Sequence, residues 1–584
     1  MIPSIKRFIP ADNFIKVSRF QKVFSSGLTP YLQKLLSTLI SDISVFSENN
    51  DFYCLLSDRK DSVPKQEPDP GFDSYVIQIK PEGIRIDANS FGGLFYGIQT
   101  LMQLPDDLQC GTIQDSAAIK YRMIHWDLKG YQPKLSVLLE EMEILARHKI
   151  NAILLEIEDK YQFRSAPGFA YPGAYTFEEM RQISRRASEL NLMIVPVLQS
   201  IAHVDYILKH KQYSHLRENG HCFQFCSSNP EVDEFWNRMA DELMDCFAEH
   251  PQYFHIGADE ARYLGSCPEC SRIGKAGSYI RRVEKSIDHV LKKGRTPVIW
   301  DDILRNSEKK MTEEEARECW QLGRKAVVMY WSYGRNGENN VFPFVRRYLD
   351  AGINVWASGC CSGADNWAGS IPPMEYRSAN VAAWAKTAVE NHLECECATA
   401  WTKILSGDCP CEPQECCWYS ILYAADALWT GSPKGFRKFI YEASSQFYHE
   451  IPDEHLIESI LNIQKSPYIL EYLDKGDAQN HRLRFLQLAA AVESLSLIAR
   501  EVFCWNQFYP GKIGYRLEDY RVDEIKKMVS LRKQQVADLK MRIKDSLNEF
   551  YTEQTVREFL DTRFQFLETF IDETNRKISV TESI

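Results

Sequence analysis

Between about residue 120 and residue 430, the sequence repeats one pattern eight times. A short apolar run, long enough for one strand, precedes a longer segment whose apolar residues have helical spacing. The runs lie at residues 123–128, 152–157, 193–198, 253–257, 297–300, 326–331, 353–357 and 397–401. Eight such repeats predict an α/β fold, the closed (β/α)8 or TIM barrel. An open doubly wound sheet is the alternative, but the number of repeats and the lack of a glycine-rich phosphate loop favour closure.

Segments of different character flank the predicted barrel. Alternating runs at 75–80 and 84–88 predict a β-hairpin, and residues 92–104 predict a helix that packs on it. After residue 432 apolar residues recur with helical spacing, which predicts a bundle that braces the barrel or forms a dimer surface. We therefore expect a small α/β domain, a catalytic barrel and a helical domain at residues 1–118, 119–431 and 432–584.

The composition excludes several classes of function. The chain has 69 Lys and Arg against 80 Asp and Glu, a net charge of −11, so no basic surface for nucleic acid is indicated. No run approaches the roughly 20 apolar residues that cross a bilayer. Lys6, Arg7, Pro10 and Asp12 interrupt the first apolar residues, so no signal peptide is predicted. We expect a cytoplasmic protein that binds neither nucleic acid nor membrane.

The strongest chemical signal is the segment 253–260, which reads Tyr-Phe-His-Ile-Gly-Ala-Asp-Glu. Because side chains alternate along a strand, His255, Gly257 and Asp259 would share the interior face, with Gly257 leaving room in a pocket. Glu260 follows where the strand ends, so both carboxylates can reach the carboxyl-terminal mouth, where barrel active sites lie. Adjacent acids repel each other, which makes the pair unlikely to serve stability alone. The segment therefore predicts a catalytic pair.

The pattern His-x-Gly-x-Asp-Glu at 255–260 resembles the signature of glycoside hydrolase family 20, the β-N-acetylhexosaminidases. Residues 121–130 and 195–203 resemble more narrowly its hexosaminidase D-like branch, and residues 75–104 are similar to the domain that precedes many such barrels. The resemblance covers roughly residues 20–430. It implies a retaining exo-enzyme that acts on an oligosaccharide or glycoconjugate with a terminal β-linked N-acetylgalactosamine or N-acetylglucosamine.

The resemblance also implies substrate-assisted catalysis, in which the 2-acetamido oxygen of the sugar attacks and closes an oxazolinium ring. Glu260 would be the general acid, with a pKa raised by burial and by the neighbouring negative charge. Asp259 would hold the acetamido N–H and balance the charge of the ring. This chemistry needs no metal and no cofactor.

Further residues match sugar-binding positions of the family. Arg122 matches an arginine that holds sugar hydroxyls, although a structural ion pair with Asp127 or Glu156 is the alternative. Tryptophans that would enclose the acetamide methyl, or else belong to the core, are Trp300, Trp331 and Trp401.

Two histidines, an aspartate and a tyrosine complete the predicted site. His255 and His203 are substrate-binding candidates, although Ile-Ala-His replaces the family's Pro-Gly-His at His203 and a core histidine is the alternative. Asp365 lies near the family's sugar-binding Tyr and Asp. Either Tyr330 or Tyr333 could supply the hydroxyl, and we include Tyr333 among the candidates.

The cysteines allow more than one interpretation. The chain has 17, an odd number, so buried reduced thiols are the favoured interpretation. Cys267-Pro-Glu-Cys270 could form half of a zinc site, and a redox pair is a further alternative. Partners for such a site would be Cys222 and Cys226, Cys395 and Cys397, or Cys409, Cys411, Cys416 and Cys417. None has the usual spacing of a second zinc knuckle.

Two other functions are weighed against the hydrolase. A family 84-like glycosidase shares the N-terminal domain and the mechanism but uses two aspartates, and Glu260 argues against it. A catalytically inactive carbohydrate-binding protein would not need to keep both acids, Arg122 and three tryptophans. A homodimer is compatible with the helical tail.

Overall fold

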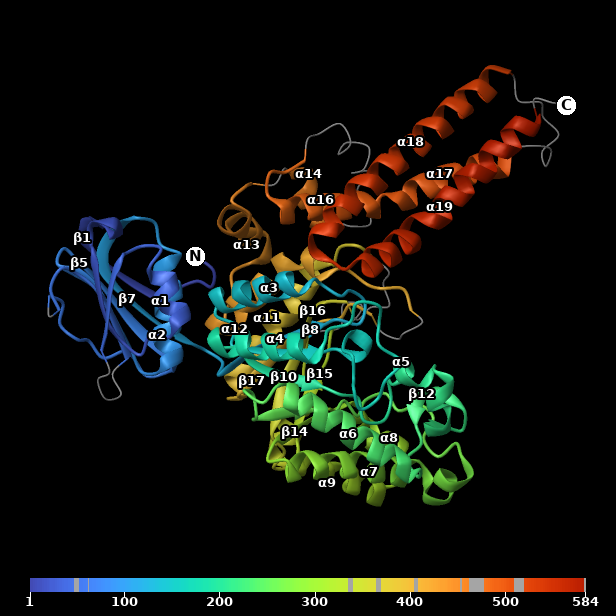
Figure 1. The fold of residues 1–584 in the computed structure, drawn as a ribbon, viewed down its shortest axis with the longest axis horizontal. Coiled ribbons are helices and arrows are strands. Elements are labelled where there is room, and N and C mark those ends of the chain that lie inside the picture. The colour runs from blue at the N-terminus through green and yellow to red at the C-terminus, as the bar shows by residue number, and fades with distance from the viewer. Residues whose placement is uncertain are drawn as a thin grey trace.

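The computed structural model has three parts: an N-terminal sheet with two helices, a barrel, and a C-terminal helical region (Figure 1). The structure describes residues 1–46, 52–60, 62–334, 340–363, 369–403, 408–451, 454–461, 477–508 and 519–581.

The N-terminal sheet has seven strands in the order β1-β7-β5-β6-β4-β2-β3. Its strands are β1 Arg7–Lys16, β2 Lys22–Ser26, β3 Asp42–Phe46, β4 Phe52–Leu56, β5 Phe72–Lys80, β6 Gly83–Ala88 and β7 Asp107–Ala117. The predicted hairpin is the antiparallel pair β5–β6, and the predicted helix is α2, Phe91–Met102. The other helix is α1, Pro30–Leu36.

Helix α2 joins the sheet to the barrel. Nearly all of its side chains are buried, because one face packs on the sheet and the other on the barrel. A Cβ at Gly97 would lie 2.7 Å from Cγ2 of Ile86, so the close approach to β6 requires glycine. On the other face, the ring of Tyr96 meets Trp429 of the barrel edge to face, with centroids 5.6 Å apart.

The barrel confirms the eight predicted strands. All are parallel, and the sheet closes in the order β10-β13-β14-β15-β16-β17-β8-β9. They are β8 Tyr121–Asp127, β9 Ala152–Glu156, β10 Met193–Val197, β13 Tyr253–His255, β14 Thr296–Trp300, β15 Val327–Trp331, β16 Val355–Ser362 and β17 Cys395–Ala400. Apolar side chains such as Met123, Leu154 and Met329 fill the interior, so the barrel is a packed core.

Helices surround the barrel. They are α3 Leu135–Arg147, α4 Phe177–Glu189, α6 Pro230–Cys246, α7 Pro268–Lys292, α8 Asp302–Lys310, α9 Glu313–Lys325, α10 Phe344–Asp350, α11 Met374–Glu390 and α12 Trp418–Thr430. The connection between β10 and α6 also contains the short helix α5, Asp205–Leu208, and a small hairpin, β11 Arg217–Glu218 and β12 His221–Phe225.

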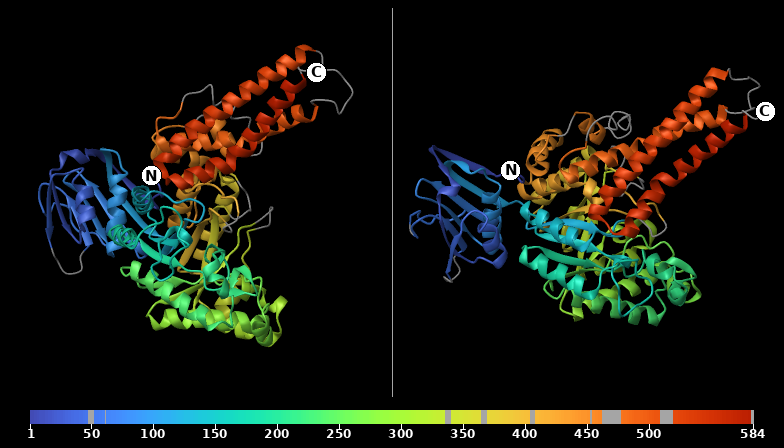
Figure 2. Two further views of the ribbon diagram at one scale, coloured as in Figure 1. Left: turned by 45° about the vertical axis from the view of Figure 1, so that its right-hand side comes forward. Right: turned by 45° about the horizontal axis from the view of Figure 1, so that its top comes forward.

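The C-terminal region is helical, as predicted. It comprises α13 Phe436–Ala443, α14 Glu454–Leu461, α16 His481–Glu493, α17 Leu495–Phe508, α18 Asp519–Phe550 and α19 Glu553–Thr581. The two longest helices, α18 and α19, lie side by side and extend away from the barrel (Figure 2). None of the helices in the described part of the chain combines the length and apolar character that crossing a membrane requires.

The turn between α18 and α19 contacts the loop that follows β8. The backbone N–H of Lys134 donates to the carbonyl of Phe550 at 2.8 Å, and that of Thr552 donates to the carbonyl of Gln132 at 3.1 Å. Arg563 of α19 donates to the carbonyls of Gly369 and Pro410 at 2.7 and 3.0 Å. The helical region therefore supports loops on the side where the barrel strands end.

Candidate active site

The loop after β13 carries the predicted catalytic pair. The predicted strand 253–257 is too long, because β13 ends at His255 and Gly257, Ala258 and Glu260 have φ values of 66°, 74° and 45°. Such left-handed conformations cost non-glycine residues about 1–3 kcal/mol and persist where the surroundings impose them. Asp259 is therefore placed by a strained loop and not by strand alternation.

Gly257 is required by two separate features of this loop. Its φ lies in the left-handed region, and a Cβ would lie only 1.7 Å from Oε1 of Gln199. Glycine here makes room for the side chain of Gln199, which comes from the loop after the neighbouring strand β10.

The two acids meet His203. Its Nε2 lies 3.4 Å from Oδ2 of Asp259 and 3.3 Å from Oε2 of Glu260. Glu260 also accepts a hydrogen bond from Arg262 at 2.9 Å. Asp259 is buried, whereas the side chain of Glu260 is 35% exposed. The three side chains that the sequence predicted from two different strand ends thus converge at the carboxyl-terminal mouth.

The expected upward shift of the pKa of Glu260 is wrong. The contact with His203 and the positive charge of Arg262 lower the pKa of Glu260 to about 2, against the opposing effect of burial. Burial and the neighbouring Glu260 raise the pKa of Asp259. Burial favours neutral His203, but Asp259 and Glu260 outweigh it and raise the pKa of His203. The charges of His203 and Arg262, which the sequence argument did not consider, therefore determine the direction of the shift in the pKa of Glu260.

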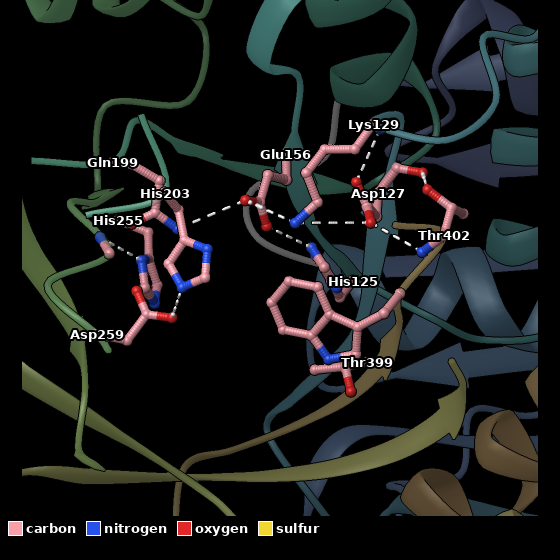
Figure 3. A network of polar contacts seen from close by, with 12 residues as sticks. His125, Asp127, Lys129, Glu156, Gln199, His203, His255, Asp259, Thr399 and Thr402 are labelled. Carbon is pink, nitrogen blue, oxygen red and sulfur yellow. Dashed lines mark hydrogen bonds and ion pairs between the residues drawn. The ribbon is translucent and has the colours of Figure 1, made fainter. Parts of the chain in front are cut away.

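A charged network lies next to this group (Figure 3). Glu156, at the end of β9, contacts Nε2 of His125 at 3.0 Å and accepts from Nζ of Lys129 at 3.1 Å. Gln199 donates to Glu156 at 3.5 Å. Burial alone would raise the pKa of Glu156, but the contacts with Lys129 and His125 have the larger effect and hold the pKa below its ordinary value. Glu156 and Lys129 are therefore a buried ion pair.

His125 and Lys129 were missed by the sequence argument, and their signal lies in the segment 121–130. Met123 points into the barrel, so the alternation of β8 also directs His125 inward. The ring of His125 lies 4.4 Å from that of Trp401, and Nζ of Lys129 lies 4.4 Å above the same indole.

Arg122 does not reach the pocket, which corrects the prediction of a sugar contact. It belongs to the outward-facing set at the start of β8, whereas the site lies at the strand ends. Its guanidinium donates to Asp73 of the N-terminal part at 2.8 Å and to the backbone carbonyls of Lys149, Ile119 and Lys120 at 2.7, 2.9 and 3.0 Å. The structural alternative holds, with Asp73 as the ion-pair partner in place of Asp127 or Glu156.

The aromatic candidates form one continuous group. The ring of Trp300 lies 4.6 Å from His255 and 5.9 Å from Trp401. Trp401 donates from Nε1 to the hydroxyl of Tyr333 at 3.0 Å, and the rings of Tyr333 and Trp331 are 5.2 Å apart. Five of the six predicted aromatic and imidazole side chains, all but His203, therefore adjoin one another on this side of the barrel.

The two candidate tyrosines pack in different parts of the barrel wall. The ring of Tyr330 lies on the outside of the barrel, 5.1 Å from Trp384 of α11. Tyr333 is buried among the aromatic candidates of the mouth. Asp365 lies outside the described residues.

His255 forms the inner end of the group. It is fully buried, and its Nδ1 accepts from the backbone N–H of Gly257 at 3.0 Å, so Nε2 carries the proton of the neutral ring. Burial lowers the pKa of His255 to about 3. His255 is therefore an uncharged donor at neutral pH, and its Nε2 has no hydrogen-bond partner in the described part of the chain.

Two further acids at the end of β14 were missed. Oδ2 of Asp302 accepts from the backbone N–H of Glu260 at 3.1 Å, and burial together with Asp259 and Asp301 raises the pKa of Asp302 to about 8. Burial raises the pKa of Asp301 to about 7. Adjacent acids directly after an apolar strand were the signal used for Asp259, and it applied here as well. Asp302, Glu260 and Arg262 line a groove that continues from the site.

Comparisons with known proteins agree with this geometry. The model of the glycosyl hydrolase family 20 catalytic domain matches residues 119–431, and that of domain 2 of the family matches residues 2–116. Hexosaminidase D of Homo sapiens is 28% identical over 291 residues, which cover 47% of this chain and 57% of that protein. Hexosaminidase D of Bos taurus is 28% identical over 285 residues, which cover 46% of this chain and 79% of that protein.

The fold is shared with solved structures. A chitobiase of Flavobacterium johnsoniae superposes with a TM-score of 0.59 at 18% identity, over 92% of this chain and 88% of that chain. The matched span of human hexosaminidase D is little more than half of that protein. Because the catalytic-domain model alone accounts for more than half of the residues and coincides with the barrel, the chain belongs to glycosyl hydrolase family 20.

Proposed function

We propose that the chain is a retaining exo-β-N-acetylhexosaminidase that hydrolyses terminal β-linked N-acetylgalactosamine or N-acetylglucosamine through an oxazolinium intermediate. The observation that carries the proposal is the meeting of Asp259, Glu260 and His203 at the barrel mouth, in a chain of this family. Its substrate would be a small oligosaccharide or a glycoconjugate.

In the proposed reaction the acetamido oxygen of the substrate attacks the anomeric carbon, and the bond to the leaving oxygen breaks. Asp259 accepts the acetamido N–H and balances the positive ring; its Oδ1 has no hydrogen-bond partner in the described part of the chain. Glu260 gives a proton to the leaving oxygen and then takes one from the water that opens the ring. Tyr333 would hold the acetamido oxygen, and Trp300 and Trp401 would enclose the methyl group.

The low pKa of Glu260 requires a source for this proton. Nε2 of His203 lies 3.3 Å from Oε2 of Glu260, and the raised pKa of His203 together with the lowered pKa of Glu260 favours the proton on His203. Because desolvation disfavours an ion pair, a substrate that displaces water would favour the neutral pair, with the proton on Glu260. We propose that His203 supplies the proton in this way.

Sugar hydroxyls would be held by residues at the ends of β8 and β9. Lys129 and Glu156 present opposite charges beside the ring of Trp401, and we assign them the role first expected for Arg122. Asp365 remains a predicted contact.

Location and assembly are further parts of the proposal. We propose a cytoplasmic location, supported by the absence of disulfides among the described cysteines. A homodimer would use the exposed apolar side chains of α18 and α19, such as Met541 and Phe566, which are 57% and 75% exposed.

The test compares nitrophenyl β-glycosides that differ only at the 2-position. The two N-acetylhexosaminides should be hydrolysed and the plain β-glucoside should not, because it lacks the internal nucleophile. Glu260→Gln should lose about 10²-fold or more in turnover of substrates with poor leaving groups. Asp259→Asn should lower kcat more than it raises KM, because its contact strengthens in the transition state.

Glu178→Gln, in an exposed position on the first turn of α4, is the matched control and should retain full activity. Equal rates on the glucoside and the amides would contradict substrate assistance. An inactive wild-type chain that binds the sugars would favour the carbohydrate-binding alternative.

A further inference from the structure

Three cysteines and a glutamate meet at the start of α7, the helix that follows the loop carrying Asp259 and Glu260. Cys267 caps the N-terminus of α7, Cys270 lies in its first turn, Cys226 follows β12, and Glu218 ends β11. The one metal-binding oxygen or sulfur of each lies within 4.8 Å of the others. Cys226, Cys270 and Glu218 are buried, and Cys267 is half-buried. Segments far apart in the sequence thus bring four potential ligands to one point.

The distances fit a tetrahedral ion. Zinc–thiolate bonds of about 2.3 Å at tetrahedral angles place two sulfurs about 3.8 Å apart. Sγ of Cys226 lies 3.7 Å from Sγ of Cys267 and 3.8 Å from Sγ of Cys270. A disulfide would bring its two sulfurs to about 2.05 Å. The cluster has the spacing of shared coordination and not that of a sulfur–sulfur bond.

Glu218 supplies the second, independent observation. Its side chain is almost fully buried, with Oε2 3.1 Å from Sγ of Cys270 and Oε1 accepting from the N–H of Cys267 at 2.7 Å. In the described part of the chain no lysine, arginine or histidine forms an ion pair with it. A buried carboxylate surrounded by thiols is costly without a cation, and a bound divalent ion would provide the charge.

We propose that Glu218, Cys226, Cys267 and Cys270 bind a structural Zn²⁺ ion. Thiolates select zinc over hard cations such as Mg²⁺ and Ca²⁺, and the protein fills all four positions, which is typical of structural sites and not of catalytic ones. This departs from the expectation of a chain without metal. Of the partners considered for the Cys-x-x-Cys pair, only Cys226 contributes, and Cys222 is exposed.

The ion would tie the β11–β12 hairpin to the catalytic loop. Phe223 of the hairpin meets the ring of His203 edge to face at 4.8 Å, and His221 stacks on Tyr263 at 3.8 Å. The backbone N–H of Tyr263 donates to Oε1 of Gln224 at 2.9 Å. Tyr263 lies three residues beyond Glu260. Zinc would therefore fix both the wall behind His203 and the far end of the loop that carries Asp259 and Glu260.

The test measures zinc bound per chain, on the whole chain, after equilibration with chelator-buffered Zn²⁺. The wild type should hold one zinc ion, and Cys226→Ser, Cys267→Ser and Cys270→Ser should each lower occupancy tenfold or more at limiting free zinc. Cys222→Ser is the matched control, since it removes an exposed thiol four residues from Cys226 and should leave occupancy at one.

Two further measurements test the proposal even if a serine variant fails to fold, because they use the wild-type cysteines. Cobalt added to the apo wild type should give the intense thiolate-to-cobalt charge-transfer absorption of a three-thiolate site, and Glu218→Cys should strengthen that absorption. Three thiols should be protected from a thiol reagent with zinc bound and become reactive after chelation. Four results would each overturn the proposal. They are no bound zinc, equal thiol reactivity with and without zinc, a disulfide among the three cysteines in protein purified with a reductant, and loss of zinc from Cys222→Ser.

Discussion

At the scale of single residues, His203 has the central position, because it contacts both acids of the site. Its Nε2 lies at nearly equal distances from Asp259 and Glu260, and its φ of 55° places it in the left-handed region. Its raised pKa and the lowered pKa of Glu260 have one cause, the attraction between a cation and the carboxylates. The sequence argument considered the charge of the two acids but not that of their neighbours.

This coupling predicts a bell-shaped dependence of kcat/KM on pH. The proposed reaction requires ionised Asp259, and burial raises the pKa of Asp259, so activity should fall as the pH drops through this raised pKa. It also requires the proton shared by His203 and Glu260, which is lost as the pH rises through the His203 pKa, above 6.5. A pH series on a nitrophenyl N-acetylhexosaminide measures both limbs.

Replacement of His203 by glutamine separates this account from a structural role. Glu260 would then titrate alone beside Arg262. The basic limb of the kcat/KM profile should therefore move to lower pH, and the maximum value of kcat/KM should fall. A lower rate with an unmoved basic limb would mean that His203 only supports the fold of the site.

At the scale of elements, the loop after β13 concentrates backbone strain next to the chemistry. Ala258, Glu260 and Gly257 have positive φ, and only Gly257 has a residue type that adopts this region without cost. A long strand 253–257 would have been regular, but it could not direct both acids toward His203.

Substitution of Gly257 by alanine tests this loop. A left-handed conformation alone costs alanine about 1–2 kcal/mol of unfolding free energy. Gly257→Ala should lose more than this, because the new Cβ would also overlap the side chain of Gln199. Gly173→Ala is the matched control, with a φ of 83° and open space around the added methyl group. Denaturant unfolding of both variants and of Gly257→Ala with Gln199→Ala measures the two contributions. Equal losses in the two single variants would contradict the steric account.

At the scale of the whole molecule, the N-terminal sheet and the barrel meet around Arg122. Its guanidinium lies between the rings of Tyr96 and Trp429, 5.1 and 5.0 Å from their centroids, and pairs with Asp73. An arginine that the sequence placed in the pocket therefore joins two parts of the chain. The boundaries predicted at residues 118 and 431 remain predictions, which limited proteolysis can test.

The position of Arg122 predicts that its substitution lowers the stability of the protein but not the catalytic activity of the folded fraction. Arg122→Met breaks a buried ion pair, which costs about 3–5 kcal/mol of unfolding free energy. The fraction that remains folded should keep its KM, because Arg122 lies at the opposite end of the barrel from the site. Thermal unfolding and initial rates on the same preparation measure this. A raised KM with unchanged stability would restore the sugar-binding role.

The sequence by itself determined the eight-fold strand–helix pattern, and the number of repeats with no glycine-rich phosphate loop favoured a closed barrel. It also placed Asp259 and Glu260 at the mouth, because they directly follow a barrel strand. It also identified Trp300, Trp401 and Tyr333, which lie at or just beyond the carboxyl ends of β14, β17 and β15 and meet at the mouth of the barrel. Tertiary structure alone decided which face of β8 holds Arg122, which cations surround Glu260, and that Glu218 and Cys226 join Cys267 and Cys270. Each of these depends on contacts between segments distant in the chain, and local spacing carries no record of such contacts.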